Sequence, residues 1–184
     1  MRRPQPPRRA DARRNYELLL TAAKQVFGEY GAGAPLDEVA RRAGVGNATM
    51  YRHFPTRRDL LVAVYSDEVG ELGARATALA EELPPGDALF AWLGEFAAHV
   101  ADKRDLALAV PEGDDREGLF AQWHAVMRET AATLLDAARG AGAVRPDLAA
   151  PDLLALANGV AVTGADAAGR ARLLGIVRHG CAPG

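Results

Sequence analysis

The stretch LDEVARRAGVGNATMYRHFPTRR, residues 36–58, has the pattern of two short helices joined by a tight turn. Ala40 is small, as required where two helices cross closely, and Gly44 follows at the turn, where a left-handed backbone is cheap only for glycine. The apolar positions that would lock the helices together are Val39, Ala43, Val45 and Met50. The spacing predicts a helix-turn-helix.

The second of these helices carries side chains suited to nucleic acid. Short donors and acceptors, a planar guanidinium and an aromatic hydroxyl are the groups that contact base edges and phosphates. Here they are Asn47, Thr49, Tyr51, Arg52 and His53. Arg57 and Arg58 begin the next helix, where free backbone N–H groups also favour a phosphate.

His53 also fits a catalytic base or a metal ligand. Either role needs a neighbouring acid or a second ligand, and the local sequence supplies none. Phosphate contact, or packing under Tyr51, is the better interpretation. We predict no catalytic residue, metal site or cofactor.

The sequence around this motif is helical. Before it, one apolar stripe of helical period is formed by Tyr16, Leu19, Leu20, Ala23, Val26, Phe27 and Tyr30. After it, Thr56 and Asp59 form a capping-box pattern that opens a long helix. That helix should end at Pro84-Pro85-Gly86.

Further helices are predicted over about 88–102, 103–110, 118–140, 151–164 and 166–179. No segment combines strand alternation with β-branched enrichment. The fold class is therefore all-α with about nine helices. The polar segment 111–118 between two of these helices is predicted to be a loop. Its acidic part (EGDDRE, 112–117) is interpreted as a solvated surface, and a cation site is the alternative.

The charge is unevenly distributed along the 184 residues. Residues 1–60 hold twelve basic and six acidic side chains, whereas residues 61–184 hold ten and eighteen. The basic residues 1–60 and the acidic residues 61–184 indicate that only the N-terminal part binds an anionic partner. The single cysteine excludes an intrachain disulfide, and no apolar run reaches the length of a membrane span. We expect a cytoplasmic protein without membrane contact.

Residues 1–12, MRRPQPPRRADA, are rich in proline and arginine and lack an apolar period. They are predicted to form a flexible basic arm. The arm either adds salt-dependent affinity for DNA or only solubilises the chain.

The segment AxxAGVxxxTxYRHFxTRxxL, residues 40–60, resembles the DNA-binding domain of the tetracycline-repressor (TetR) family. Tyr51, His53 and Phe54 fall at the family's spacing from Gly44. Residues 119–160 resemble more loosely the C-terminal domain of one large, divergent subgroup.

The resemblance implies DNA contacts by position. Bases or their sugars would be contacted by Asn47, Ala48, Thr49 and Arg52, and phosphates by Tyr51, His53 and Arg57. Arg13 and Arg14 would lie near the backbone or minor groove. Two departures are Ala48, where the family often has Gly or Pro, and Ala34-Pro35, which replaces a hydroxyl residue that contacts phosphate.

The C-terminal stretch suits pairing with a second copy. Many small residues would let two helices approach closely, and ordinary packing within the chain is the alternative. The predicted interface is Leu153, Leu156, Val160, Leu173, Ile176 and Val177.

Aromatic residues gather between positions 90 and 127. Two helical stripes with one histidine each would enclose a flat or apolar molecule, and a plain aromatic core is the alternative. The stripes are Trp92, Phe96 and His99, then Phe120, Trp123, His124 and Met127.

Together these features predict an arm (1–12), a DNA-binding domain (13–58) and a helical-bundle domain for ligand binding and dimerisation (59–184). The expected function is a homodimeric transcriptional regulator, a repressor that an unidentified small molecule releases from a palindromic operator in double-stranded DNA. Activation or constitutive binding fits the sequence equally. The alternatives are a helical binding module without DNA-binding activity and a small all-α enzyme.

Overall fold

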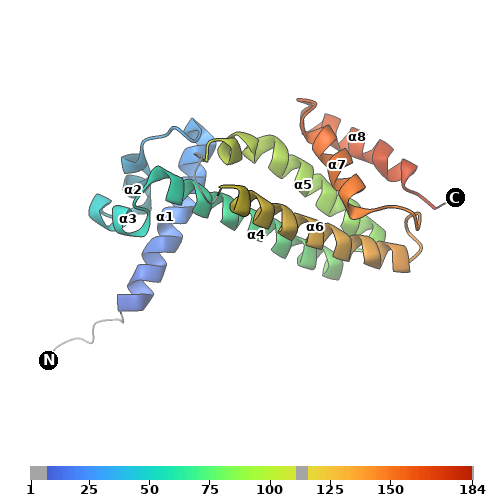
Figure 1. Ribbon diagram of the computed structural model, residues 1–184, viewed down its shortest axis with the longest axis horizontal. Coiled ribbons are helices and arrows are strands. Elements are labelled where there is room, and N and C mark those ends of the chain that lie inside the picture. Colours follow the sequence, from blue (N-terminus) through green and yellow to red (C-terminus); the bar gives the residue numbers. More distant parts are fainter. Residues whose placement is uncertain (1–7, 111–115, 184) are drawn as a thin grey trace. The chain divides into compact units, whose positions relative to one another are not determined.

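The computed structural model describes residues 8–110 and 116–183, and this part of the chain forms eight α-helices and no strand (Figure 1). The all-α prediction is confirmed. The helices are α1 (Arg8–Tyr30), α2 (Leu36–Ala43), α3 (Asn47–His53), α4 (Arg57–Glu82), α5 (Pro85–Leu108), α6 (Arg116–Gly140), α7 (Ala150–Ala161) and α8 (Ala167–Gly180).

Two predicted boundaries were wrong. The separate helices expected over 88–102 and 103–110 are one continuous helix, α5, because no glycine or proline interrupts residues 95–108. Likewise α1 begins at Arg8, inside the predicted arm, since alanine and arginine extend a helix once the last proline, Pro7, is passed. The rest of the arm (1–7) and residues 111–115 of the predicted loop lie outside the described residues.

The chain divides into two compact units. Within the described residues, the first unit comprises 8–66 with 105–110, and the second comprises 67–104 with 116–183. The division falls inside α4 and inside α5, so no linker separates the units.

The first unit is held by an apolar core. Leu19 and Val26 of α1, Val39 of α2, Met50 of α3 and Leu60 of α4 are all fully buried. The stripe predicted on α1 is therefore correct at its centre but too long. Tyr30 is 61% exposed, because it lies at the helix end next to the left-handed Gly31.

Local backbone contacts set the turn of the helix-turn-helix. Gly44 has φ +65°, its N–H bonds to the Arg41 carbonyl, and the Val45 N–H bonds back to the Ala40 carbonyl. This Schellman arrangement satisfies carbonyls at the end of α2 and turns the chain towards α3. The predicted capping box is also present, since Thr56 Oγ1 accepts from the Asp59 N–H (3.2 Å) and Asp59 accepts from the Thr56 N–H (2.9 Å).

The second unit depends on contacts between distant segments. Trp92 is fully buried, and its Nε1 donates to the Leu72 carbonyl across α5 and α4 (2.9 Å). Asp87 of α5 pairs with Arg178 of α8, and the Arg145 N–H donates to the Cys181 carbonyl (3.0 Å). These links gather α4, α5 and the C-terminal helices into one bundle.

None of the helices in residues 8–110 and 116–183 combines the length and apolarity needed to cross a membrane. In the same residues no three side chains of the His, Cys, Asp or Glu type are grouped closely enough to hold a metal ion.

Candidate nucleic-acid interface and effector site

Helix α3 has an exposed polar face and is anchored in the core of the first unit by one buried residue. Met50 is fully buried, whereas Tyr51 is 45% exposed and Asn47, Ala48 and Arg52 are also exposed. Thr49 is half-buried. The structure thus brings the predicted base-contacting side chains together on one short helix.

Asn47 is held in place by the preceding helix. Its Nδ2 donates to Asp37 Oδ1 (3.0 Å), at the start of α2. The sequence analysis did not single out Asp37, because ten residues separate the two and only the turn at Gly44 brings them together.

His53 lies in an aromatic cluster. Its ring centroid is 6.1 Å from that of Tyr16 and 6.3 Å from that of Phe54, and Tyr16 and Phe54 are 5.2 Å apart. The side chain is half-buried. His53 therefore packs against Tyr16 and Phe54, whereas the sequence analysis expected packing under Tyr51 or a phosphate contact.

Arg57 is occupied by the backbone of the loop before α2. Its Nη1 donates to the carbonyls of Ala32 (2.8 Å) and Ala34 (2.6 Å). Arg58 differs, since its Nε and Nη2 are buried with no hydrogen-bond partner in the described residues. On α1, Arg13 is exposed and pairs with Glu17 (3.2 Å), and Arg14 is exposed as well.

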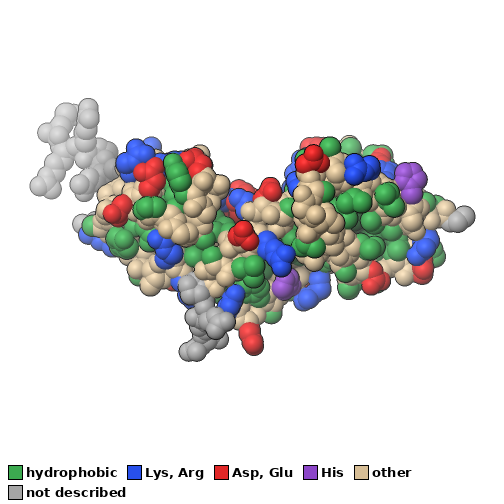
Figure 2. Space-filling model, turned by 90° about the horizontal axis from the view of Figure 1, so that it is seen from above, with side chains coloured by type: hydrophobic (Ala, Val, Ile, Leu, Met, Phe, Trp, Pro, Cys, Tyr) green, Lys and Arg blue, Asp and Glu red, His purple; other side chains and the backbone are tan. Residues whose placement is uncertain are grey.

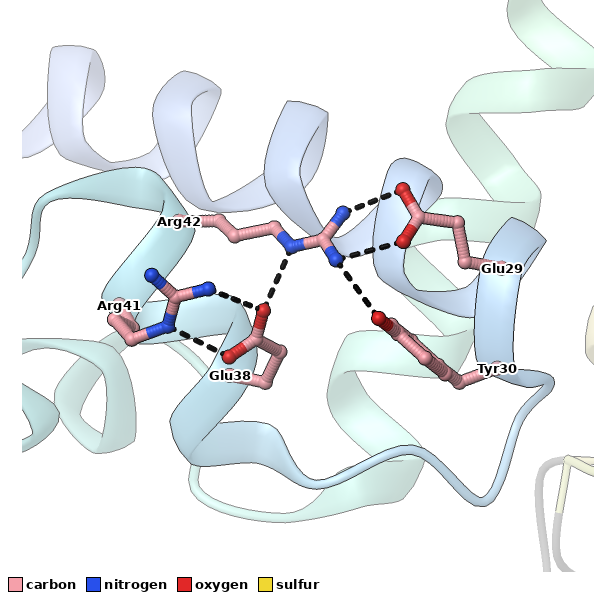
Figure 3. Close-up of polar contacts among 5 residues, drawn as sticks. All are labelled: Glu29, Tyr30, Glu38, Arg41 and Arg42. Atoms are coloured by element: carbon pink, nitrogen blue, oxygen red, sulfur yellow. Dashed lines mark hydrogen bonds and ion pairs between the residues drawn. The ribbon is translucent and has the colours of Figure 1, made fainter.

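An ion-pair network joins α1 to α2 near this interface (Figure 3). Arg42 bonds to both carboxylate oxygens of Glu29 (2.6 and 2.7 Å) and to Glu38 (2.8 Å). Arg41 also bonds to both oxygens of Glu38 (2.7 Å each). Hydrogen bonds from the two arginines lower the pKa of Glu38 to about 2. The i+3 and i+4 spacing of Glu38, Arg41 and Arg42 is a signal in the sequence, whereas the link to Glu29 is not.

The first predicted ligand-binding stripe lies inside the second unit. Trp92 and Phe96 stack at 5.8 Å and are buried. His99, one turn further, is 9% exposed, and burial lowers its pKa. Their burial agrees with the alternative of a plain aromatic core.

The second stripe runs along α6. Phe120 packs against Trp123 (5.1 Å between centroids) and His124 (6.3 Å), and the Arg116 guanidinium lies 5.3 Å from its ring. Trp123 and Met127 are buried, while His124 is exposed. The histidines of the two stripes therefore lie in different surroundings.

Two hollows of the second unit have the size of a small-molecule site. One, of about 400 Å³, lies between α4 and α5 and is lined by Glu68, Glu71, Leu72, Arg75, Glu95, His99, Asp102 and Lys103. Ion pairs flank it, because Arg75 pairs with Glu95 (2.9 Å) and Lys103 with Glu68 (2.9 Å). The other, of about 350 Å³, lies between α4 and α6, and most of its lining residues are glycine, alanine or threonine, such as Gly73, Thr77 and Thr130.

The predicted dimer residues fall into two groups. Leu153 and Val160 are buried within the chain, whereas Ile176 is 65% exposed, Leu156 is exposed, and Leu173 and Val177 are half-buried. Figure 2 shows hydrophobic side chains gathered on the face of the second unit that carries the C-terminal helices.

Comparison with known protein families gives two matches that together span most of the chain. Residues 19–64 match the family described as bacterial regulatory proteins, tetR family. Residues 84–183 match the family described as transcriptional regulator SbtR-like, C-terminal domain. No curated protein sequence matches the chain.

Solved structures agree with these families. The chain is 36% identical to a TetR transcriptional regulator from Streptomyces coelicolor, covering 91% of this chain and 98% of that one with a TM-score of 0.77. It is also 36% identical to a TetR regulatory protein from Mycobacterium vanbaalenii, covering 96% and 100% with a TM-score of 0.79. A gamma-butyrolactone receptor, at 22% identity and a TM-score of 0.64 over 94% and 90%, shares the fold.

Proposed function

Because the chain belongs to the TetR family of transcriptional regulators, and is a DNA-binding regulator of transcription, we propose that it acts as a repressor that a small molecule releases from a palindromic operator. The single observation that carries the proposal is the polar face of α3, exposed on a helix that buried Met50 anchors. An exposed face of this kind fits the major groove. The proposed site of action is the cytoplasm.

The proposed DNA contacts follow the exposure of each side chain. We assign base or sugar contacts to Asn47, Ala48, Thr49 and Arg52, and a phosphate contact to the Tyr51 hydroxyl. Arg13 and Arg14 are exposed, which suits contact with a phosphate or with the minor groove. His53, Arg57 and Arg58 are half-buried, so they support the interface, and the two arginines add positive charge beside it.

A homodimer supplies the second DNA-binding domain that a palindromic operator requires. The proposed interface centres on exposed Ile176 and Leu156, with half-buried Leu173 and Val177 beside them. Leu153 and Val160 support this face from within the chain. A contiguous exposed apolar patch is a usual mark of an interaction surface.

We place the effector site in the second unit. The proposed domains are residues 13–58, which bind DNA, and residues 59–184, which bind the effector and form the dimer. The hollow lined by His99 offers an imidazole and charged groups around the apolar Leu72, which suits an organic molecule with a polar end. Helix α4 contributes residues to both units. An effector that binds beside α4 can therefore shift the population between conformations that differ in the arrangement of the two DNA-binding domains of the dimer. No catalytic role is proposed for any residue.

The test is an unbiased selection from random double-stranded DNA with the purified full chain at near-physiological salt. Enrichment of a palindromic motif is the expected result and would supply an operator for all further work. If no sequence is enriched, and a protein freed of bound small molecules by unfolding and refolding also enriches none, the sequence-specific function is wrong and a binding module without DNA-binding activity takes its place.

A further inference from the structure

All three nitrogens of the Arg42 guanidinium have a hydrogen-bond partner. Nη1 and Nη2 bond to the two oxygens of Glu29 at 2.6 and 2.7 Å, and Nε bonds to Glu38 at 2.8 Å (Figure 3). The Tyr30 hydroxyl lies 3.4 Å from Nη2, and the guanidinium carbon lies 5.6 Å from the Tyr30 ring centroid. Each nitrogen of this side chain therefore has an assigned partner on α1 or α2.

Bidentate pairing makes this contact directional as well as attractive. A guanidinium that bonds to both oxygens of one carboxylate fixes the plane and the distance of its partner. The Arg42 side chain is 21% exposed, so solvent screens it less than a fully exposed pair, whereas that of Arg41 is 72% exposed. Arg41 bonds to Glu38 alone, within its own helix.

The position of Arg42 connects this geometry to DNA recognition. It occupies the last turn of α2, two residues before the left-handed Gly44 that starts the turn into α3. Glu29 occupies the last turn of α1. The Arg42–Glu29 pair thus ties the end of α2 to α1 at the point from which the DNA-binding helix departs.

We propose that Arg42 is a positioning residue for operator recognition, which orients α3 by clamping α2 to α1 and does not itself contact DNA. The inference rests on the operator-binding function proposed above. Two carboxylates already compensate the charge of Arg42, so a phosphate would compete with Glu29 and Glu38 for it. Glu38 and Glu29 are carboxylates near neutral pH, and their hydrogen bonds to arginine lower the pKa of both further.

The test compares Arg42→Ala with the matched control Arg41→Ala, which removes the same charge one residue away without touching α1. Both variants are titrated with the duplex that the wild-type protein selects and with a random-sequence duplex, over a range of salt concentrations. We expect Arg42→Ala to weaken operator binding about tenfold, the size typical of losing charge-assisted hydrogen bonds. Binding to the random duplex should change much less.

The salt dependence separates positioning from contact. A lost phosphate contact lowers the slope of log affinity against log salt by about 0.9. A lost positioning contact leaves that slope unchanged and lowers the ratio of operator to random-duplex affinity. A merely structural role would lower thermal stability but leave that ratio as in the wild type at temperatures well below unfolding.

Two further variants complete the test. Arg42→Lys keeps the charge but cannot bond to both oxygens of Glu29 with two nitrogens, and should recover only part of the operator affinity. In a Glu29→Ala background, Arg42→Ala should add little further loss, because the clamp is already broken.

The inference is overturned if Arg42→Ala leaves the operator ratio unchanged, if its salt slope falls by the amount of one phosphate, or if Arg41→Ala lowers the ratio equally. Failure of the wild-type protein to select any duplex overturns the proposed function instead, so the two failures are distinguishable.

Discussion

The two units of this protein are built from contacts of different range. In the first, the turn and the cap of the helix-turn-helix are set by residues three to five positions apart, as in the Thr56–Asp59 capping box and the Val45–Ala40 hydrogen bond. In the second, the polar contacts that join separate helices connect residues 20 to 91 positions apart, as in Trp92–Leu72 and Arg178–Asp87.

This difference limits what a pattern of residues can predict in each unit. Short-range contacts require particular residue types at particular spacings, so the DNA-binding unit keeps a recognisable pattern. A helical bundle tolerates many apolar combinations of the same total volume, so its sequence leaves the shape of its hollows open.

The largest effect is expected from Trp92→Ala, which removes a fully buried ring of the second unit and its hydrogen bond to Leu72. The loss should be about 3–5 kcal/mol in the free energy of unfolding, measured by urea denaturation. Phe90→Ala, a half-buried ring on the same helix, should cost clearly less. Equal losses for both variants would show that long-range burial does not dominate this unit.

The next effect concerns the exposed face of the first unit. Arg52→Ala should relax the choice of sequence by about 1–3 kcal/mol at the base pair that it contacts. Tyr51→Phe, which removes only a hydroxyl, should weaken binding to all duplexes alike. The measurement is the DNA selection repeated with each variant. An unchanged preference in both Arg52→Ala and Thr49→Ala would contradict the base-contact assignment.

A smaller effect tests the local geometry of the turn. Gly44→Ala places a side chain at φ +65°, which should cost about 1–2 kcal/mol in the free energy of unfolding. Gly46→Ala is the matched control, because Gly46 has φ −66° and open space around its Cα. Urea denaturation of the two variants gives the comparison. If Gly46→Ala destabilises the protein as much, the left-handed turn is not the cause.

The smallest effect is a pH dependence of the second unit. Burial lowers the pKa of His99, with Glu68, Asp102 and Lys103 as its charged neighbours. As pH falls through the ordinary histidine pKa of 6.5, the unfolded chain takes up a proton that the folded chain refuses, so stability should fall below that pH. His99→Gln should flatten this part of the stability profile, because glutamine does not titrate. A profile that keeps the wild-type slope in the variant would contradict the assignment.

Sequence reasoning described the first unit well, for physical reasons visible in particular residues. The turn needs a left-handed residue at position 44, and a capping box needs a hydroxyl and a carboxylate three residues apart. It was wrong about the burial of Tyr30, which lies at the end of α1 beside the left-handed Gly31, and about a break within α5, where no glycine or proline interrupts residues 95–108.

By itself, then, the sequence determined the helical class, the helix-turn-helix over residues 36–58 and the polar face of α3, because each depends on neighbours a few residues away. Only the tertiary structure decided that Arg42 clamps α2 to Glu29, that Asp37 holds Asn47, and that Arg57 supports a loop. The sequence offers each charged side chain several oppositely charged or polar partners, and folding brings only some of them within hydrogen-bonding distance.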